Sequence, residues 1–439
     1  MTADRTRSQQ LYDRALKVMP GGASRNTILR RPHPLYVERG QGARVYDVEG
    51  VERIDFANNM ASLIHGHAHP AIVSAVGDQL ERGTAFTLGT EREIEYAEHL
   101  VDRAASFDKI RFVNSGTEAV MACLKASRAF TGRPKIAKAE GAYHGLYDFA
   151  EISQTAQPAT WGDPCHPASV PVAYGTPQSV LDDVIVIPFN DAEHALARLD
   201  EHADEIACVL IDPVPHRVGL IPIEPAFVRT LRDWTERNGS LLVYDEVITF
   251  RIAHGGAQEQ HGIRPDLTAL GKMIGGGFPV GAIAGRREVM DVMDPLAERV
   301  LFPHSGTFSA NPITMTAGYT AMKLYDREAV ERINTLAVRA RNQIEDAISV
   351  AGITACVTGA GSMLRVHFKP EPPREYRTCY MAPDEAPLLS AFLDYLFDHG
   401  IILINTGTVM LSTVMTEREI DTLSEAMLGG FRKVRELSP

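Results

Sequence analysis

Three short segments of this sequence carry residue types whose chemistry could be combined in one site. Segment 114–119 (NSGTEA) follows a β-rich run and begins a helical pattern, so its free amides and hydroxyls could hold a phosphate. Asp245 ends the apolar run 241–244, and such a strand-end carboxylate lies at the ligand-binding edge of an open α/β sheet. Lys272 precedes a glycine cluster, and a desolvated lysine becomes a usable amine. Each feature alone could equally be a helix cap, a capping aspartate or a surface lysine.

In combination, the three segments provide a phosphate cradle, a carboxylate for a protonated ring nitrogen, and a desolvated amine. Pyridoxal phosphate needs these contacts: an anchored phosphate, a protonated pyridine and a Schiff base. The chain has no G-x-x-x-x-G-K-S/T motif, which excludes a P-loop NTPase, and Gly275–Gly277 lack the spacing of a dinucleotide-binding fingerprint. The residues therefore predict a pyridoxal-phosphate site.

A mostly parallel sheet is expected to position these segments. Strand-like runs alternate with helical patterns over 117–130 and 226–237, which is typical of an α/β sheet with helices on both faces. The predicted strands are 109–113, 134–138, 184–187, 206–211, 240–244 and 280–284.

After residue 312 the pattern changes. A long helix is predicted over 313–350, with a break near Asp326, and shorter strands and helices follow it. We therefore expect an N-terminal segment (1–55) that packs with a small C-terminal α+β domain (312–439), and a large cofactor-binding domain (56–311) between them.

Composition narrows the class of protein. Of 439 residues, 45% are hydrophobic and 23% charged, which excludes a disordered chain. A net charge of −12 argues against nucleic-acid binding, because phosphate binding relies on clustered Lys and Arg. Five widely spaced cysteines without a CxxC pair argue against a disulfide framework or structural zinc. No apolar run approaches the about 18 residues of a membrane helix and no signal-peptide pattern is present, so we expect a cytoplasmic protein without membrane contact.

Seven motifs, in order, extend over nearly the whole chain and are specific as a set. They are PGG-x-SR (20–25), HGHAHP (65–70), NSGTEA (114–119), GAYHG (141–145), YDEV (244–247), PDLTALGK (265–272) and HSGTFSANP (304–312). With them the sequence resembles the class III (ω-type) aminotransferases of the fold type I pyridoxal-phosphate enzymes, in the branch of glutamate-1-semialdehyde aminomutases and β-amino acid aminotransferases. The resemblance implies a large domain with a mostly parallel, seven-stranded-type sheet and a small α+β domain built from both chain ends.

The resemblance also assigns residue roles around the cofactor. Lys272 would be the Schiff-base lysine and proton shuttle, and Asp245 would hold the pyridinium proton. Ser115, Gly116 and Thr117 would bind the phosphate.

Three further positions complete the expected cofactor site. Tyr143 would stack on the cofactor ring and Val247 would pack on its opposite face. Thr307 would reach the cofactor phosphate of the neighbouring subunit, which makes a homodimer the functional unit.

On the substrate side, Arg25 would hold a carboxylate through a bidentate pair, and His65 is expected near the substrate. His65, His67 and His69 recur at a spacing of two, which a metal site could use, but no acidic or cysteine partner is identifiable. We therefore expect no metal.

The sequence departs from the family pattern at three places. Pro215 stands where many members have a glutamine, so either His216 or Arg217 takes its role or no residue does. Segment 249–251 lacks the usual Gly-Phe-Arg, as in the β-amino acid aminotransferases. Segment 405–409 lacks the arginine that those enzymes use for the α-carboxylate of the second substrate. Either Arg25 serves both substrates, or another residue takes over, or the second substrate is not an α-keto acid.

The predicted function is transamination by a ping-pong mechanism: an amino group moves from an amino compound to a keto acid or another carbonyl acceptor. A β-amino acid is one candidate for the amino compound. A glutamate-1-semialdehyde-type 2,1-aminomutase is the nearest alternative. An amino acid racemase or epimerase and a non-catalytic binding protein are further alternatives, the last disfavoured by the Lys272–Asp245 pair.

Overall fold

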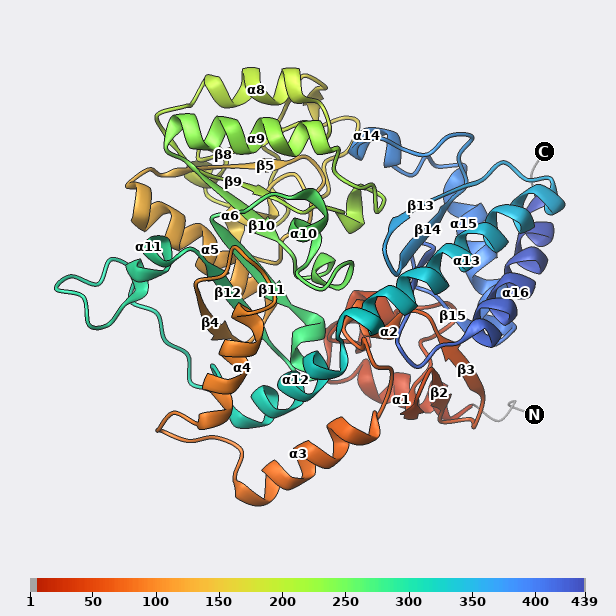
Figure 1. Cartoon of the computed structure of the whole chain (residues 1–439). Coiled ribbons are helices and arrows are strands. Elements are labelled where there is room, and N and C mark those ends of the chain that lie inside the picture. Colours follow the sequence, from red (N-terminus) through yellow and green to blue (C-terminus); the bar gives the residue numbers. More distant parts are fainter. Residues whose placement is uncertain (1–5, 438–439) are drawn as a thin grey trace.

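The computed structural model describes residues 6–437, and its largest sheet has seven strands (Figure 1). The strand order is β4 (Lys109–Val113), β12 (Gly281–Gly285), β11 (Leu267–Gly271), β10 (Leu241–Asp245), β9 (Ile206–Ile211), β5 (Lys135–Ala139) and β8 (Val184–Ile187). β12 runs antiparallel to both neighbours, and the pairs from β11 to β8 are all parallel. The predicted fold class, a mostly parallel sheet covered by helices, is confirmed.

Strand β11 has no counterpart among the predicted strands. Its sequence LTALG contains one β-branched residue, Thr268, so its β-propensity is weak. All five residues are buried between β10 and β12, so tertiary packing decides their conformation.

Alternation along the strands sends side chains to two separate cores. Leu241 and Val243 pack on the side of α5 (Gly116–Thr131), whereas Leu242 and Tyr244 pack on the side of α8 (Ala192–Asp200) and α9 (Pro225–Asn238) (Figure 1). Because both faces are covered, all of β10 is buried, which explains its continuous apolar run.

The C-terminal part begins with two helices separated at Asp326. Helix α12 (Pro312–Leu324) ends before it, and the Asp326 carboxylate caps α13 (Arg327–Ala351) by accepting the Ala329 amide at 2.9 Å. The predicted break is therefore confirmed. A three-stranded antiparallel sheet and two helices follow: β13 (Cys356–Ala360), β14 (Met363–His367), β16 (Thr408–Met410), α15 (Glu385–Asp398) and α16 (Glu417–Arg435).

The two ends of the chain meet in a four-stranded sheet. Strands β1 (Val37–Gln41), β2 (Arg44–Asp47) and β3 (Glu52–Asp55) continue into β15 (Ile401–Ile402), which runs parallel to β3. In Figure 1 the red N-terminal strands accordingly lie beside the blue C-terminal helices. The domain limits expected at 55/56 and 311/312 stay predictions.

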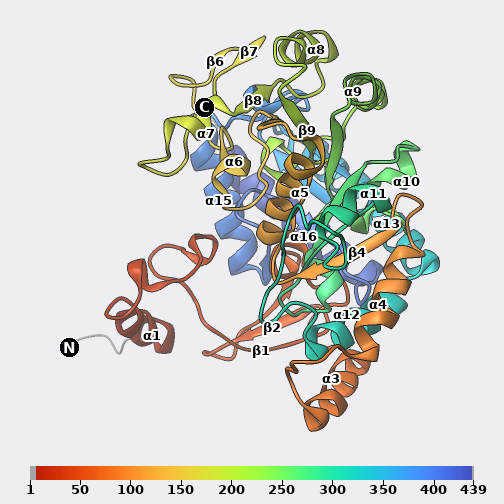
Figure 2. The same cartoon turned by 90° about the vertical axis from the view of Figure 1, so that its left-hand side faces the viewer.

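Helix α1 (Arg7–Ala15) and the segment after it extend away from the rest of the chain (Figure 2). The remaining elements are α2 (Asn58–Ala61), α3 (Pro70–Arg82), α4 (Glu91–Val101), α6 (Asp148–Glu151), β6 (Gly162–Asp163), β7 (His166–Pro167), α7 (Gln178–Asp182), α10 (Ala257–His261), α11 (Arg287–Met290) and α14 (Tyr376–Cys379). Across residues 6–437, none of the helices combines the length and the apolar character that crossing a membrane requires.

Candidate active site

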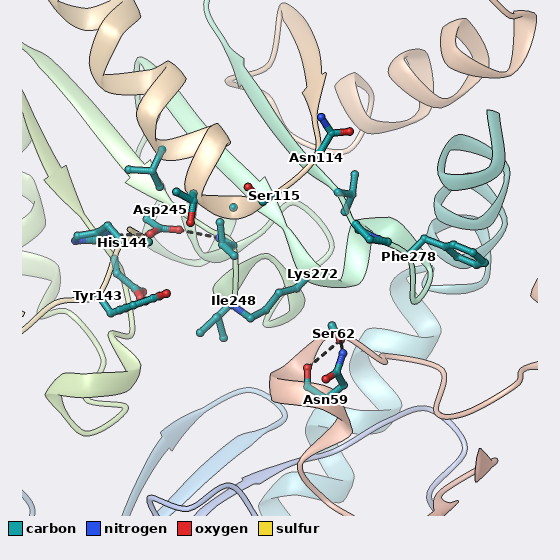
Figure 3. Close-up of a pocket in the computed structure, with 18 of the residues that line it drawn as sticks. Asn59, Ser62, Asn114, Ser115, Tyr143, His144, Asp245, Ile248, Lys272 and Phe278 are labelled. Atoms are coloured by element: carbon teal, nitrogen blue, oxygen red, sulfur yellow. Dashed lines mark hydrogen bonds and ion pairs between the residues drawn. The ribbon is translucent and has the colours of Figure 1, made fainter. Parts of the chain in front are cut away.

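A cavity of about 400 Å³ lies where β4, β10 and β11 end. Its lining includes seven of the residues expected around the cofactor: Ser115, Gly116, Thr117, Tyr143, Asp245, Val247 and Lys272. It also includes His144, Asp212, Asn59 and Ser62. In the view of Figure 3, the Lys272 side chain lies between the Asp245–His144 pair and the Asn59–Ser62 pair.

One end of the cavity is the N-terminus of α5. Ser115 caps this helix, since its hydroxyl accepts the Glu118 amide at 3.1 Å. The Glu118 carboxylate in turn accepts the Asn114 amide at 2.6 Å. As the first two helical residues, Gly116 and Thr117 have no intrahelical acceptor for their amides, so two donors and the positive end of the helix dipole remain for an anion.

Two glycines allow other segments to approach this end closely. A Cβ on Gly281 would lie 2.0 Å from the Ser115 carbonyl oxygen, and a Cβ on Gly145 would lie 2.6 Å from the Thr117 hydroxyl. Gly145 also adopts φ +95°, which L side chains rarely adopt. Any side chain at these two positions would displace the α5 terminus.

The cavity lining also contains a buried acid, Asp245, and its partner His144. Asp245 Oδ2 lies 2.8 Å from His144 Nδ1, and Asp245 Oδ1 accepts the Val247 amide at 3.0 Å. Burial lowers the pKa of His144, although the bond to Asp245 opposes this shift. Within the described residues, His144 Nε2 is buried without a hydrogen-bond partner. His144 was not among the predicted site residues, although its place in GAYHG next to Tyr143 was the signal for it.

Lys272 follows β11 directly and takes a strained conformation. Its φ is +50°, in the left-handed region, which costs a non-glycine residue about 1–3 kcal/mol. Burial lowers the pKa of Lys272, and the carboxylates of Asp245 and Asp212 oppose this shift. The amine is therefore easier to deprotonate than that of an exposed lysine.

Asp212 is a second buried carboxyl group in the lining. It accepts the Val214 amide at 2.9 Å, and burial, together with the charge of Asp245, raises its pKa well above its usual value. Of the two candidates to replace the missing glutamine, neither His216 nor Arg217 lines the cavity. The Arg217 guanidinium instead lies 5.2 Å from the centre of the Tyr143 ring.

At the substrate side, Arg25 reaches the cavity through one intermediate. Its guanidinium donates to the Asn59 side-chain oxygen at 2.6 Å, and the Asn59 amide donates to Ser62 Oγ at 3.0 Å. Asn59 and Ser62 line the cavity, whereas Arg25 itself is exposed at its rim.

Asn59 belongs to a left-handed turn. The four residues Asn58–Ala61 have φ of 45°, 46°, 57° and 70°, although none of them is glycine. The turn is anchored by Asn58, whose side chain donates to the Met410 carbonyl at 2.7 Å and whose amide donates to Asp55 Oδ1 at 3.0 Å. Such strain persists only where surrounding contacts impose it, and it is common at functional sites.

His65 does not line the cavity, and its expected place near the substrate stays a prediction. Its Nδ1 lies 2.7 Å from Thr413 Oγ1, and its Nε2 lies 2.8 Å from the Ala321 carbonyl. Burial lowers its pKa to about 4, so the ring is neutral at pH 7. Both nitrogens are engaged in tertiary contacts, and His65 holds the segment after the left-handed turn against α12. His67 instead pairs with Asp55 at 2.8 Å, and the described residues contain no group of three metal-ligating side chains.

Thr307 is exposed and lies outside the cavity of its own chain. Its expected contact with a neighbouring subunit's cofactor stays a prediction.

The lining residues fit a phosphorylated pyridine. Two free amides at the α5 terminus offer an anion site, and the glycines at 145 and 281 let the neighbouring segments pack against this terminus without displacing it. Asp245, fixed by His144 and the Val247 amide, offers a carboxylate, and Lys272 offers a buried amine.

Comparison with known proteins agrees with this chemistry. The profile of the family "Aminotransferase class-III" matches residues 28–428. A glutamate-1-semialdehyde 2,1-aminomutase of Desulforudis audaxviator is 38% identical, over 98% of this chain and 99% of the relative. An omega-transaminase from Sphaerobacter thermophilus is 44% identical, with a TM-score of 0.96 over 99% of both chains. A beta-phenylalanine aminotransferase from Variovorax paradoxus is 33% identical, with a TM-score of 0.86 over 96% of this chain and 93% of its own. The chain belongs to the class III aminotransferases and is a pyridoxal-phosphate-dependent enzyme of that family.

Proposed function

We propose that this enzyme transfers an amino group from an amine-bearing carboxylate, in particular a β-amino acid, to a keto acid or other carbonyl acceptor by a ping-pong reaction. The observation that carries the proposal is that Lys272, Asp245 and the open N-terminus of α5 line one cavity, with Arg25 at its rim. When bound, pyridoxal phosphate supplies an electron sink for the bond-breaking step at the amino-bearing carbon.

Lys272 is the group that would hold the cofactor covalently and would then move the proton. Its lowered pKa favours the neutral amine, which is the form that acts as a nucleophile and as a base. The strained backbone keeps the amine on the cavity side of β11.

The two ends of the cavity orient the ring between them. The amides of Gly116 and Thr117 hold the phosphate, with the Ser115 and Thr117 hydroxyls nearby. Asp245 keeps the proton on the ring nitrogen, and His144 fixes the Asp245 carboxylate. Tyr143 and Val247 both line the cavity and are proposed to pack on the two faces of the ring.

Arg25 provides the positive charge that would bind the carboxylate of the substrate. Within residues 6–437 its recorded hydrogen bond goes to the neutral amide of Asn59 rather than to a carboxylate, so its positive charge is available to a ligand. A guanidinium at the rim suits a substrate whose carboxylate lies away from the reacting carbon. The similarity to a β-phenylalanine aminotransferase supports the β-amino acid as donor.

The experiment that tests this proposal is a panel of amine donors, with pyruvate as acceptor and product detection by chromatography. We expect β-amino acids to be the best donors, and we expect Lys272→Ala to lose all turnover. Turnover that survives in Lys272→Ala would refute the proposal.

A 2,1-aminomutase is the second candidate, because relatives 36–40% identical over 90% or more of this chain carry that name. A mutase moves the amino group within one molecule, so it forms an isomer without a separate acceptor. We expect no such isomer from glutamate-1-semialdehyde. Its formation at a rate above that of any transamination would reverse the assignment.

The proposal includes a cytoplasmic homodimer. Thr307 is exposed in the single chain, and a second subunit would bring it to the neighbouring cavity. All five cysteines are free thiols, which fits a reducing compartment. Light scattering on purified protein should give twice the mass of one chain, and a mass of one chain would refute the dimer.

A further inference from the structure

Helix α14 (Tyr376–Cys379) comes from the C-terminal part of the sequence but contacts the end of a strand of the large sheet. In Figure 1 it lies apart from α15 and α16. Its N-cap, Glu375, accepts the amides of Arg377 at 2.6 Å and Thr378 at 2.7 Å, so this short helix has a well-defined start. Two of its side chains, Tyr376 and Arg377, reach the loop that follows β5, and none of the roles proposed above uses them.

Arg377 forms a bidentate ion pair with Glu140, the residue directly after β5. The Arg377 Nε donates to Glu140 Oε2 at 2.9 Å, and the Nη2 donates to Oε1 at 3.1 Å. The two side chains are 13% and 4% exposed, so both charges are largely withdrawn from water. A bidentate pair fixes direction as well as distance, and loss of one partner leaves the other charge buried and unpaired.

The rest of the Arg377 guanidinium is fixed by the β6–β7 hairpin. Its Nη1 donates to the Gly162 carbonyl at 2.9 Å. Its Nη2 also donates to the carbonyls of Trp161 at 2.9 Å and Asp163 at 3.1 Å. The planar fork of arginine makes this arrangement possible, whereas the single ammonium of a lysine could not serve all these acceptors. Arg377 is therefore held independently of Glu140 and can fix the position of its carboxylate.

Tyr376 packs on the next residue of the loop, Gly141. A Cβ on this glycine would overlap the Tyr376 ring, and its φ of +74° is one that L side chains rarely adopt. The Tyr376 hydroxyl donates to the Ala156 carbonyl at 2.7 Å, and the residue is 7% exposed, so the ring is fixed at its far end as well. Helix α14 therefore sets the position of the backbone at Glu140 and Gly141.

The loop that begins at Glu140 leads directly into the main cavity. Only two residues separate Glu140 from Tyr143, and His144 comes next. Tyr143 and His144 both line the cavity, and His144 Nδ1 lies 2.8 Å from Asp245 Oδ2. Over so short a segment, a displacement at Glu140 would be passed on to the two side chains in the cavity.

We propose that Tyr376 and Arg377 are positioning residues of the active site. They hold the start of this loop in the place from which Tyr143 reaches the cavity and His144 reaches Asp245. The inference rests on the cofactor roles proposed above for Tyr143 and His144, and it makes the affinity for pyridoxal phosphate depend on the C-terminal part of the chain.

Arg53 and Asp47 provide a matched control pair. Arg53 Nη1 donates to Asp47 Oδ2 at 2.7 Å, and the two side chains are 11% and 5% exposed, nearly the same as for Arg377 and Glu140. Arg53 also donates to a carbonyl, that of Phe397, at 3.2 Å. Neither Arg53 nor Asp47 lines the cavity. Arg53→Met therefore removes a buried pair of the same kind without a change at the loop.

The test measures cofactor binding without an amine substrate. Holoenzyme is dialysed against a series of pyridoxal phosphate concentrations, and the bound fraction is read from the visible circular dichroism. Arg377→Met should weaken the affinity about tenfold, and Arg53→Met should change it less than about twofold. An unchanged affinity in Arg377→Met, or equal losses in these two variants, would overturn the proposal.

Two milder variants keep the test decisive if Arg377→Met does not fold. Glu140→Gln can still accept one hydrogen bond from Arg377, so it should weaken the affinity by a smaller factor than Arg377→Met, but by more than Arg53→Met does. Tyr376→Leu, which removes the ring from Gly141, should act in the same direction. An affinity in Glu140→Gln equal to that of the wild type would overturn the role of Arg377, and the same result in Tyr376→Leu would overturn that of Tyr376.

A double-mutant cycle shows whether α14 acts through the loop. The same dialysis is carried out with Arg377→Met added to Tyr143→Ala/His144→Ala. If the loop carries the effect, Arg377→Met should weaken the affinity less than about threefold in this background, because the side chains that it positions are already gone. A full tenfold loss in both backgrounds would overturn the positioning role.

The same measurements separate this inference from the proposed function. Because no amine is present, a failure of the donor panel leaves the result for Arg377 intact. Unchanged cofactor affinity in Tyr143→Ala/His144→Ala would refute the cofactor roles proposed for these two residues. Weakened affinity in that variant, together with unchanged affinity in Arg377→Met, would refute the positioning role alone.

Discussion

The side of the main cavity that fits the cofactor lies at the end of the seven-stranded sheet, whereas the side that we propose for the substrate is formed by one left-handed turn, Asn58–Ala61. On the first side, Asp245 ends β10 and Lys272 directly follows β11, and both strands are fully buried. The Asp245 carboxylate also accepts the Val247 amide, two residues further along the chain. On the second, Asn59 is held in a strained turn by contacts with residues far along the chain, and Arg25 is exposed. We therefore expect substitutions on the first side to affect the chemistry itself, and substitutions on the second to affect the proposed choice of substrate.

Among the substitutions on the two sides, removal of the Lys272 amine should cause the largest loss of activity. Lys272→Ala should reduce turnover by about 10⁴-fold or more, because nucleophile and proton carrier are lost together. Borohydride reduction followed by peptide mapping should label Lys272 in the wild type. Lys138 is the control: it is fully buried with a pKa lowered to about 7, but does not line the cavity. A label on Lys138 instead would contradict the account.

Neutralising Asp245 should cause the second-largest loss of activity. Asp245→Asn should lower kcat about 10²–10³-fold, as for loss of one fixed electrostatic group. His144→Ala should have a smaller effect, about tenfold, because His144 acts through Asp245. Asp266→Asn is the matched control. Asp266 is equally buried, but it precedes β11 and therefore lies at the end of that strand away from the cavity. Equal losses of kcat in the two aspartate variants would mean that removal of any buried carboxylate lowers kcat, and that Asp245 has no special role.

On the substrate side, the expected changes are in KM. Arg25→Ala should raise KM for β-amino acids about tenfold or more and leave carboxylate-free amines within about twofold. Asn59→Ala should raise the same KM by a smaller factor, because Arg25 loses its anchor but keeps its charge. Arg30→Ala is the control, because Arg30 pairs with Asp394 at 2.7 Å away from the cavity. If Arg25→Ala affected both amine classes equally, Arg25 would not be in the substrate site.

The smallest expected effect is on the pH dependence of the free energy of unfolding, through His65. His65 has a folded-state pKa of about 4, below its unfolded value, so the unfolded chain binds more protons between these two values. Stability from the neutral ring is therefore complete above about pH 6.5 and is lost as the pH falls toward 4. In His65→Gln, urea unfolding should show a pH slope smaller by up to about 1.4 kcal/mol per pH unit in this range. An unchanged slope would mean that His65 titrates normally.

The same contrast explains what could be predicted from sequence. The cofactor side depends on local features, a strand end or a helix start, so Asp245, Lys272 and Ser115–Thr117 could be placed together from motifs. The turn Asn58–Ala61 could not, because its left-handed conformation depends on the bond from Asn58 to Met410. The contacts of His65 could not be predicted for the same reason, since its partner Thr413 is distant in sequence.

The fold shows the same difference between features that depend on local sequence and features that depend on distant contacts. The break at Asp326 is a local capping signal and was predicted. Strand β11 depends on its neighbours β10 and β12 and was missed, although it carries Lys272 at its end.

The most direct test of the central claim is a single half-reaction. Holoenzyme is mixed with β-phenylalanine without any acceptor, and the visible absorbance of the bound cofactor is followed together with the products. The account predicts that this absorbance is lost, that about one keto product forms per site, and that pyruvate restores the absorbance and yields alanine. Absorbance unchanged by any amine, or an isomerised product formed without acceptor, would contradict it.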